Sequence, residues 1–150
     1  MDLEDISVRI TMFALVALAM IAAADNFSDR EKLLGSWQPQ QTSAKEAGAW
    51  MIESKGADVW HITHSVGDQK LLEFECSTMG RDCEAKESGK PAKVSMWFNG
   101  PKLVELETKG KEVVKRRFAV AGEGDTLEIE VIPIEPAGKT ETLRFRRLQK

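Results

Sequence analysis

The residues able to carry out acid–base or metal chemistry are few in this sequence, and their spacing does not favour it. His61 and His64 are the only histidines. Side chains at i and i+3 of a β-strand point to opposite faces, so we do not expect the two imidazoles to share a metal ion. No serine lies in a nucleophile motif such as G-x-S-x-G. The sequence therefore predicts no catalytic residue, no metal site and no cofactor, and we expect a protein that is not an enzyme.

The two cysteines, Cys76 and Cys83, are separated by Ser-Thr-Met-Gly-Arg-Asp. A pair this close, around a glycine-containing turn, is typical of a disulfide in an oxidising compartment. The spacing differs from the C-x-x-C redox motif, and two thiolates do not complete a tetrahedral metal site. We predict a structural disulfide that stabilises the fold by about 2.5 kcal/mol.

Arg116 lies in the run Val113-Val114-Lys115-Arg116-Arg117-Phe118. If Val114, Phe118 and Val120 face the core, strict alternation carries Arg116 inward too. A buried arginine is costly unless it is paired, so this direction predicts an anion-binding lumen or a structural ion pair with an inward acid. A β-bulge would instead turn the side chain outward. The structural ion pair is the preferred interpretation.

An uncharged run of 13 residues, MFALVALAMIAAA, occupies residues 12–24. It is shorter than the roughly 20 residues of a membrane-spanning helix, and small residues end it as they end a signal peptide. The acidic start, with Asp2, Glu4 and Asp5 against Arg9, departs from that pattern, and an uncleaved membrane anchor is the alternative. We predict a signal peptide at 1–24 and one domain at 25–150, which is exported and periplasmic or secreted.

The composition is that of a globular domain, with 42% hydrophobic and 30% charged residues and a net charge of −3. A nucleic-acid-binding domain is usually far more basic, so no nucleic-acid partner is expected. A membrane is expected as a partner only through the N-terminal segment, if it is not cleaved. The oligomeric state is not indicated.

Ser28 and Glu31 form a capping box that predicts one short helix, Asp29–Leu34. From Gly35 onward, short runs are separated by turns rich in Gly, Pro, Asn and Asp. The expected strands are Trp37–Gln41, Ala49–Ser54, Asp58–Ser65, Lys70–Cys76, Ala92–Asn99, Lys102–Thr108, Glu112–Val120, Thr126–Ile132 and Thr140–Arg147. The pattern predicts an all-β protein, a single antiparallel up-and-down β-barrel of about 8–9 strands with one short N-terminal helix.

Alternation along these runs predicts which side chains face the core. The apolar sets include Trp60 and Ile62; Leu72, Phe74 and Cys76; Val94, Met96 and Phe98; and Val104 and Leu106. Acidic side chains alternate with them, and we expect these to face solvent, Glu105 and Glu107 included.

Gly35-Ser36-Trp37, just after the short helix, resembles the G-x-W motif of lipocalin-like, or calycin, barrels. The resemblance implies that Trp37 packs across the barrel floor against a basic residue of the last strand. Arg144, Arg146 and Arg147 are the candidates. The chain also resembles a group of exported bacterial proteins of lipocalin-like design, through Cys76–Gly80, Phe98–Pro101 and Pro136–Thr142.

The calycin resemblance implies a non-enzymatic module that binds a small apolar or amphipathic ligand in the barrel. The expected ligand-binding residues are Trp60, Phe74, Met96, Phe98 and Arg116. The alternative is a structural or protein-interaction barrel of the cell envelope with a filled interior and no small-molecule ligand. The interior of the barrel discriminates the two: a cavity of roughly 300 Å³ or more favours the first function, and a packed lumen favours the second.

Overall fold

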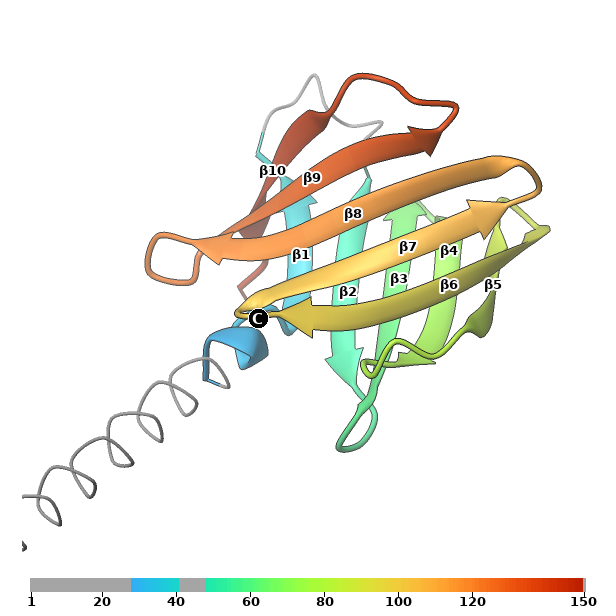
Figure 1. Cartoon of the computed structure of the whole chain (residues 1–150). Coiled ribbons are helices and arrows are strands. Elements are labelled where there is room, and N and C mark those ends of the chain that lie inside the picture. Colours follow the sequence, from blue (N-terminus) through green and yellow to red (C-terminus); the bar gives the residue numbers. More distant parts are fainter. Residues whose placement is uncertain (1–27, 41–47, 150) are drawn as a thin grey trace, which may run out of the picture.

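The computed structural model describes residues 28–40 and 48–149, which form a closed antiparallel β-barrel (Figure 1). Each strand pairs with its neighbours in the sequence, and β1 closes the barrel by pairing with β10. The ten strands are β1 (Gly35–Pro39), β2 (Ala49–Ser54), β3 (Val59–Val66), β4 (Gln69–Ser77), β5 (Cys83–Glu87), β6 (Lys90–Asn99), β7 (Lys102–Lys109), β8 (Glu112–Ala121), β9 (Thr126–Glu135) and β10 (Glu141–Arg147).

The expected all-β, up-and-down barrel is confirmed, with one strand more than the upper limit of the sequence estimate. The additional strand is β5, which reads Cys-Glu-Ala-Lys-Glu and pairs with β6 from Cys83 to Glu87. Ala85 is its only aliphatic side chain, so β5 lacks the apolar alternation that identifies a strand from sequence. The predicted leader, residues 1–24, lies outside the described residues.

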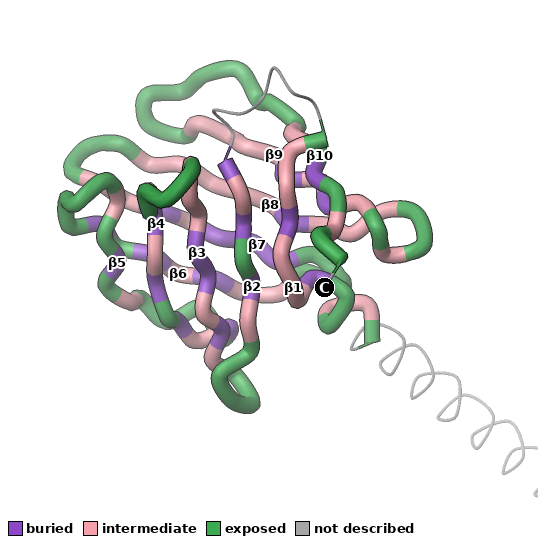
Figure 2. The backbone as a smooth tube through the Cα atoms, turned by 180° about the vertical axis from the view of Figure 1, so that it is seen from behind, coloured by how far each residue is buried: buried purple, intermediate pink, exposed green. Residues whose placement is uncertain are grey.

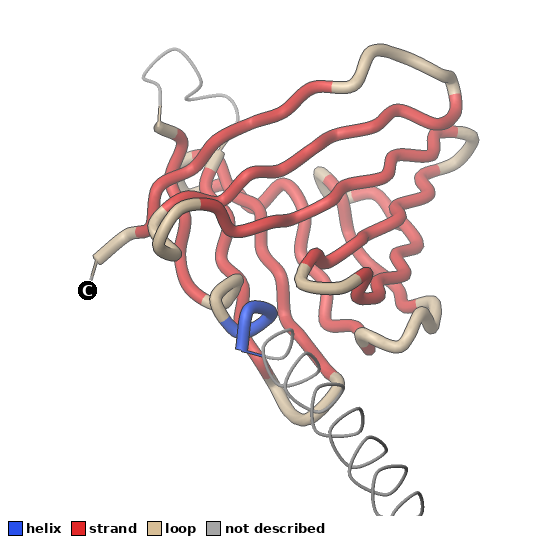
Figure 3. Tube along the Cα trace, turned by 60° about the vertical axis from the view of Figure 1, so that its left-hand side comes forward, coloured by secondary structure: helices blue, strands red, loops and turns tan. Residues whose placement is uncertain are grey.

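Residues 28–31 are helical and lie at one end of the barrel (Figure 3), which we call the helix end. The helix is shorter than the predicted Asp29–Leu34. Its last turn is tight, because the amide groups of Leu33 and Leu34 donate to the carbonyls of Arg30 and Glu31, three residues back. The chain then enters β1 at Gly35.

The G-x-W tryptophan and the last strand meet at the helix end. The indole Nε1 of Trp37 donates to the carbonyl of Leu33 at 3.0 Å, and the Trp37 side chain is fully buried. The guanidinium carbon of Arg147 lies 4.1 Å from the centre of the Trp37 ring. The partner is therefore Arg147, one of the three candidates, and not Arg144 or Arg146. Those two side chains lie on the opposite, exposed face of β10, because strand residues alternate.

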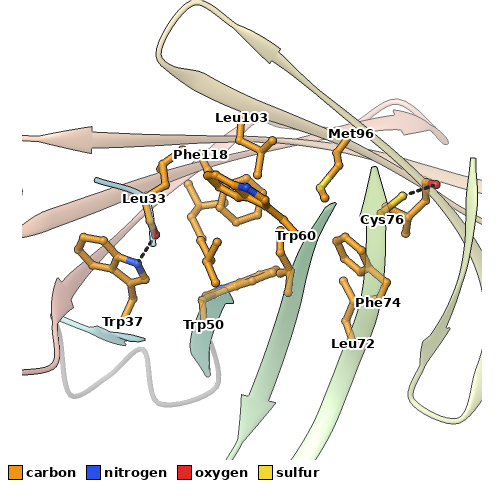
Figure 4. Close-up of a cluster of buried hydrophobic side chains, with 14 of the residues drawn as sticks. Leu33, Trp37, Trp50, Trp60, Leu72, Phe74, Cys76, Met96, Leu103 and Phe118 are labelled. Atoms are coloured by element: carbon orange, nitrogen blue, oxygen red, sulfur yellow. Dashed lines mark hydrogen bonds between the residues drawn. The ribbon is translucent and has the colours of Figure 1, made fainter. Parts of the chain in front are cut away.

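One hydrophobic core fills the middle of the barrel. Buried residues recur along the centres of the strands, whereas the turns are exposed (Figure 2). Trp60, Phe74 and Met96 belong to this core together with Trp50 and Phe118 (Figure 4).

The side chains of β7 face in the opposite direction from the one predicted. Leu103, Glu105 and Glu107 are buried inside the barrel, so the expectation that Val104 and Leu106 face the core is wrong. Val104 is only 2% exposed, but it lies on the same outer face as the half-buried Leu106 and outside the core cluster. The two-residue turn Gly100-Pro101 sets the pairing of Asn99 with Lys102, and this register places Glu105 opposite Met96. A residue paired with an inward side chain also points inward, so the turn overrides the apolar pattern.

Cys76 and Cys83 form the predicted disulfide, with Cα atoms 5.7 Å apart. The bond joins the end of β4 to the start of β5. The register between these two strands is limited to two residue pairs near the opposite end, Leu72 with Glu87 and Glu73 with Lys86. The disulfide therefore holds β4 and β5 together at the helix end, where no such pair joins them.

Candidate functional site

A pocket of about 520 Å³ opens at the helix end of the barrel. Its walls come from four segments: the short helix, the β2–β3 turn, the segment after β4, and the end of β6. The lining residues are Arg30, Glu31, Leu34, Ser54, Gly56, Ala57, Asp58, Trp60, Thr78, Met79, Trp97 and Phe98. We call this cavity the helix-end pocket.

Two aromatic rings form the inner wall of the pocket. Trp60 of β3 and Phe98 of β6 meet edge to face, with ring centres 5.2 Å apart and planes at 80°. Trp60 is 6% exposed, so most of its surface is already packed in the core. The edge-to-face contact is worth about 1 kcal/mol beyond the area that the rings bury. The two rings therefore form a rigid wall, and a ligand can contact only the side of this wall that faces the pocket.

The segment between β4 and β5 supplies the outer wall. Met79 pairs with Trp97 in an isolated bridge, and the amide of Gly80 donates to the carbonyl of Met96 at 2.9 Å. Met79 is nevertheless 68% exposed, more than any other large hydrophobic residue in the described part of the chain. An exposed thioether beside Trp97 gives the pocket a flexible apolar rim.

Arg30 is the basic residue of the pocket. Its guanidinium carbon lies 4.6 Å from the centre of the Phe98 ring, and its Nε donates to the carbonyl of Gly100 at 2.9 Å. The stacking and the hydrogen bond together fix the orientation of the guanidinium group. Arg30 thus links the helix to the β6–β7 turn across the barrel end.

A second polar cluster lies inside the barrel on β7 and β8. Arg116 is directed inward, as predicted, and its Nη1 donates to Glu105 at 3.0 Å and to Glu107 at 2.6 Å. The side chains of Glu105, Glu107 and Arg116 are 0%, 5% and 14% exposed. The guanidinium carbon of Arg116 lies 5.8 Å from the ring centre of Trp50, which stacks on His64 at 4.2 Å. Arg116 is therefore held in an ion pair with two buried carboxylates.

Burial controls the protonation of this cluster. It raises the pKa of Glu105 from 4.5 to about 7, and the positive charge of Arg116 opposes the rise. Burial alone would lower the pKa of Arg116, but the charges of Glu105 and Glu107 outweigh it and raise this pKa. Glu105 is thus the acid whose charge changes near neutral pH, while Arg116 stays charged.

The five predicted ligand-binding residues do not gather at one site. Trp60 and Phe98 line the helix-end pocket. Phe74 and Met96 are 3% and 0% exposed and are packed in the core. Arg116 is held by Glu105 and Glu107.

Arg30 and Met79, which come from two separate segments, were not expected from the sequence. The sequence predicted an inward acid as the partner of Arg116, but it wrongly placed Glu105 and Glu107 on the solvent face. A usable signal was present for these, because the turn Gly110-Lys111 pairs Lys109 with Glu112 and hence Glu105 with Arg116.

The two histidines lie apart, as expected. His61 contacts Glu53, with its Nδ1 3.1 Å from the carboxylate, whereas His64 stacks on Trp50. Among residues 28–40 and 48–149, no group of His, Cys, Asp or Glu side chains is arranged to hold a metal ion. No helix in the described part of the chain is long and apolar enough to cross a membrane.

Comparison with known proteins identifies the class of fold. A secretory abundant heat soluble protein from Ramazzottius varieornatus is 16% identical, with a TM-score of 0.63 over 78% of this chain and 96% of its own. A fatty acid binding protein of Schistosoma mansoni, solved with arachidonic acid, is 17% identical, with a TM-score of 0.64 over 81% of this chain and 99% of its own. Fatty-acid-binding protein 1 of Echinococcus granulosus is 10% identical, with a TM-score of 0.60 over 79% and 99% of the two chains.

The fold is therefore that of the lipocalin-like, or calycin, barrels, as the G-x-W resemblance implied. At these identities the similarity concerns the fold alone. No protein-family model matches the sequence, and no curated protein is significantly similar to it. The resemblance to exported bacterial proteins is not tested by these neighbours and stays a prediction.

Proposed function

We propose that this protein is a non-enzymatic, lipocalin-like module that binds a small apolar or amphipathic ligand. The helix-end pocket carries the proposal, because its volume of about 520 Å³ lies within the usual range for small-molecule sites. It contains Trp60 and Phe98, two of the residues expected from the sequence. Two structural neighbours are named as fatty-acid-binding proteins, which supports a small-molecule ligand for a barrel of this design.

A second candidate function is a structural or protein-interaction barrel with no small-molecule ligand. The observation in its favour is the filled interior: Phe74 and Met96, which were expected to line a lumen, are buried by other side chains. Under this alternative, the helix-end pocket is a surface depression without an occupant.

Export of the domain at 25–150, after removal of residues 1–24, is part of the proposal. Its support is the Cys76–Cys83 disulfide, since disulfides form and persist mainly in oxidising compartments. The intact mass of the protein purified from its own host tests this part. A chain that begins at Asp25 supports export with cleavage, and a chain that retains residues 1–24 contradicts it.

Binding can be tested with the neutral dye N-phenyl-1-naphthylamine, which fluoresces strongly in apolar surroundings. We expect saturable binding to the wild-type domain. Ala57→Trp, which fills the pocket from its exposed rim, should weaken binding at least tenfold. Ala137→Trp, at an exposed position in the β9–β10 loop, is the matched control and should leave the affinity within twofold. Absence of dye binding to the wild type would favour the filled structural barrel.

A further inference from the structure

Three arginines of this barrel each stack on an aromatic ring. Arg147 lies over Trp37, Arg116 over Trp50 and Arg30 over Phe98. A guanidinium group has five N–H donors, and a half-buried one is stabilised when acceptors meet them. The three residues differ in how many of these donors are used.

Arg147 is fully engaged by the backbone. Its Nε donates to the carbonyl of Gly124 at 3.0 Å, its Nη1 to that of Leu34 at 2.6 Å, and its Nη2 to that of Lys32 at 2.5 Å. Every nitrogen of the group therefore has an acceptor, and the residue serves the structure of the barrel floor.

Arg116 is neutralised by carboxylates. Glu105 and Glu107 bring two potential negative charges to one positive charge, inside the barrel. An anionic ligand at this position would add a further negative charge where the acids already exceed the base. Arg116 is therefore a poor receptor for an anion.

Arg30 differs from both. Only its Nε has an acceptor, the carbonyl of Gly100, and within the described residues neither Nη1 nor Nη2 has a partner. The residue is half-buried, its guanidinium group lies over the Phe98 ring, and it lines the helix-end pocket. An arginine in this state presents two parallel N–H groups to a carboxylate, sulfonate or phosphate.

The rest of the pocket fits the apolar part of such a ligand. Trp60 and Phe98 contribute their aromatic rings, and Trp97 and the exposed Met79 add further apolar lining. The two acids of the pocket, Glu31 and Asp58, are exposed to solvent, where water and salt screen their charge. The half-buried charge of the pocket is thus positive and its rim is hydrated.

We propose that the helix-end pocket selects a small planar aromatic acid, whose anionic group pairs with Nη1 and Nη2 of Arg30 while its ring packs against the apolar lining of the pocket. This inference rests on the proposed function and names the ligand class for the same pocket. The proposed ligand class is thus a molecule in which an anionic group is joined to a flat, apolar ring system.

A matched pair of dyes separates this inference from the proposed function. 8-Anilino-1-naphthalenesulfonate is N-phenyl-1-naphthylamine with a sulfonate added, and the sulfonate stays charged across the working pH range. We expect Arg30→Met to weaken binding of the sulfonate dye about tenfold and to leave binding of the neutral dye within twofold. Arg30→Lys, which keeps the charge but not the paired donors, should fall between Arg30→Met and the wild type.

Arg146→Gln, at an exposed position of β10, is the control and should change neither affinity. Because Arg30 also supports the β6–β7 turn, the neutral dye reports whether the pocket survives the substitution. If Arg30→Met weakened binding of both dyes equally, or left binding of the sulfonate dye unchanged, the proposed pairing of an anionic ligand with Arg30 would be overturned. Failure of both dyes to bind the wild-type protein would instead remove the proposed function itself.

Discussion

Arg147 covers Trp37 with its guanidinium group 4.1 Å from the ring centre, and in the same position it bonds the three backbone carbonyls of Lys32, Leu34 and Gly124. The last strand is thereby tied to the segment between the helix and β1 and to the β8–β9 turn. The Arg147 side chain therefore both helps to close the barrel and covers Trp37 at the barrel floor.

Substituting Arg147 should therefore destabilise the whole barrel. Arg147→Ala removes three hydrogen bonds and the stacking contact, and we expect a loss of about 3 kcal/mol in the free energy of unfolding. Arg144→Ala removes an exposed pair with Glu128 and should cost less than about 1 kcal/mol. Urea unfolding of both variants measures the difference, and equal losses would refute the role of Arg147.

Gly35 is required by the same contact. Its φ is +135°, and a Cβ atom there would lie 2.6 Å from Nη1 of Arg147. Gly35→Ala should therefore destabilise the fold by about 2 kcal/mol or more, through backbone strain and displacement of the guanidinium group. Gly56→Ala meets no atom within 4 Å and should stay within about 1 kcal/mol of the wild type in the same assay.

The orientation of β7 can be tested with a pair of leucines. Leu103 is fully buried in the core, whereas Leu106 lies on the outer face and is only half-buried. Leu103→Ala should cost about 3 kcal/mol because it leaves a cavity, and Leu106→Ala about 1 kcal/mol or less. Thermal and urea unfolding give the two values. A larger loss of stability for Leu106→Ala than for Leu103→Ala would instead support the orientation of β7 that was expected from the sequence.

The disulfide should support both the stability and the helix-end pocket. Loss of the Cys76–Cys83 bond is expected to cost about 2.5 kcal/mol and to weaken binding of the neutral dye, because Met79 lies in the loop that the bond closes. Unfolding and dye titration with and without a phosphine reductant measure both effects. The double variant Cys76→Ala/Cys83→Ala is the control and should not respond to the reductant.

Glu105 should make stability depend on pH near neutrality. Burial raises its pKa in the folded state to about 7, from 4.5, so the folded protein holds this proton where the unfolded chain has lost it. The contribution of Glu105 to stability therefore falls as pH rises from about 4.5 to 7, by up to about 3 kcal/mol.

Glu105→Gln keeps the shape of the side chain and removes its charge. Urea unfolding at a series of pH values from 5 to 8 should show a smaller decline in stability for Glu105→Gln than for the wild type, and a more stable variant at pH 8. The exposed substitution Glu128→Gln should retain the wild-type decline. Identical profiles for wild type and Glu105→Gln would show that Glu105 ionises normally.

The amino-acid sequence by itself determined the class of fold, the disulfide and the direction of Arg116. Alternation, turn residues and the G-x-W motif are local signals, so they can be recognised along the chain. The inward direction of Arg116 also follows from alternation, because Phe118 lies two residues further on the same face.

Only the tertiary structure decided which residues meet. The register of two hairpins placed Glu105 rather than Leu106 in the core, and closure of the barrel brought Arg147 rather than Arg144 or Arg146 onto Trp37. The helix-end pocket joins Arg30 to Phe98 across 68 positions of sequence. The two hairpin turns are local signals from which the register of β7 could be derived. Barrel closure and the contacts of the pocket instead join distant segments at once, and no local pattern along the chain specifies them.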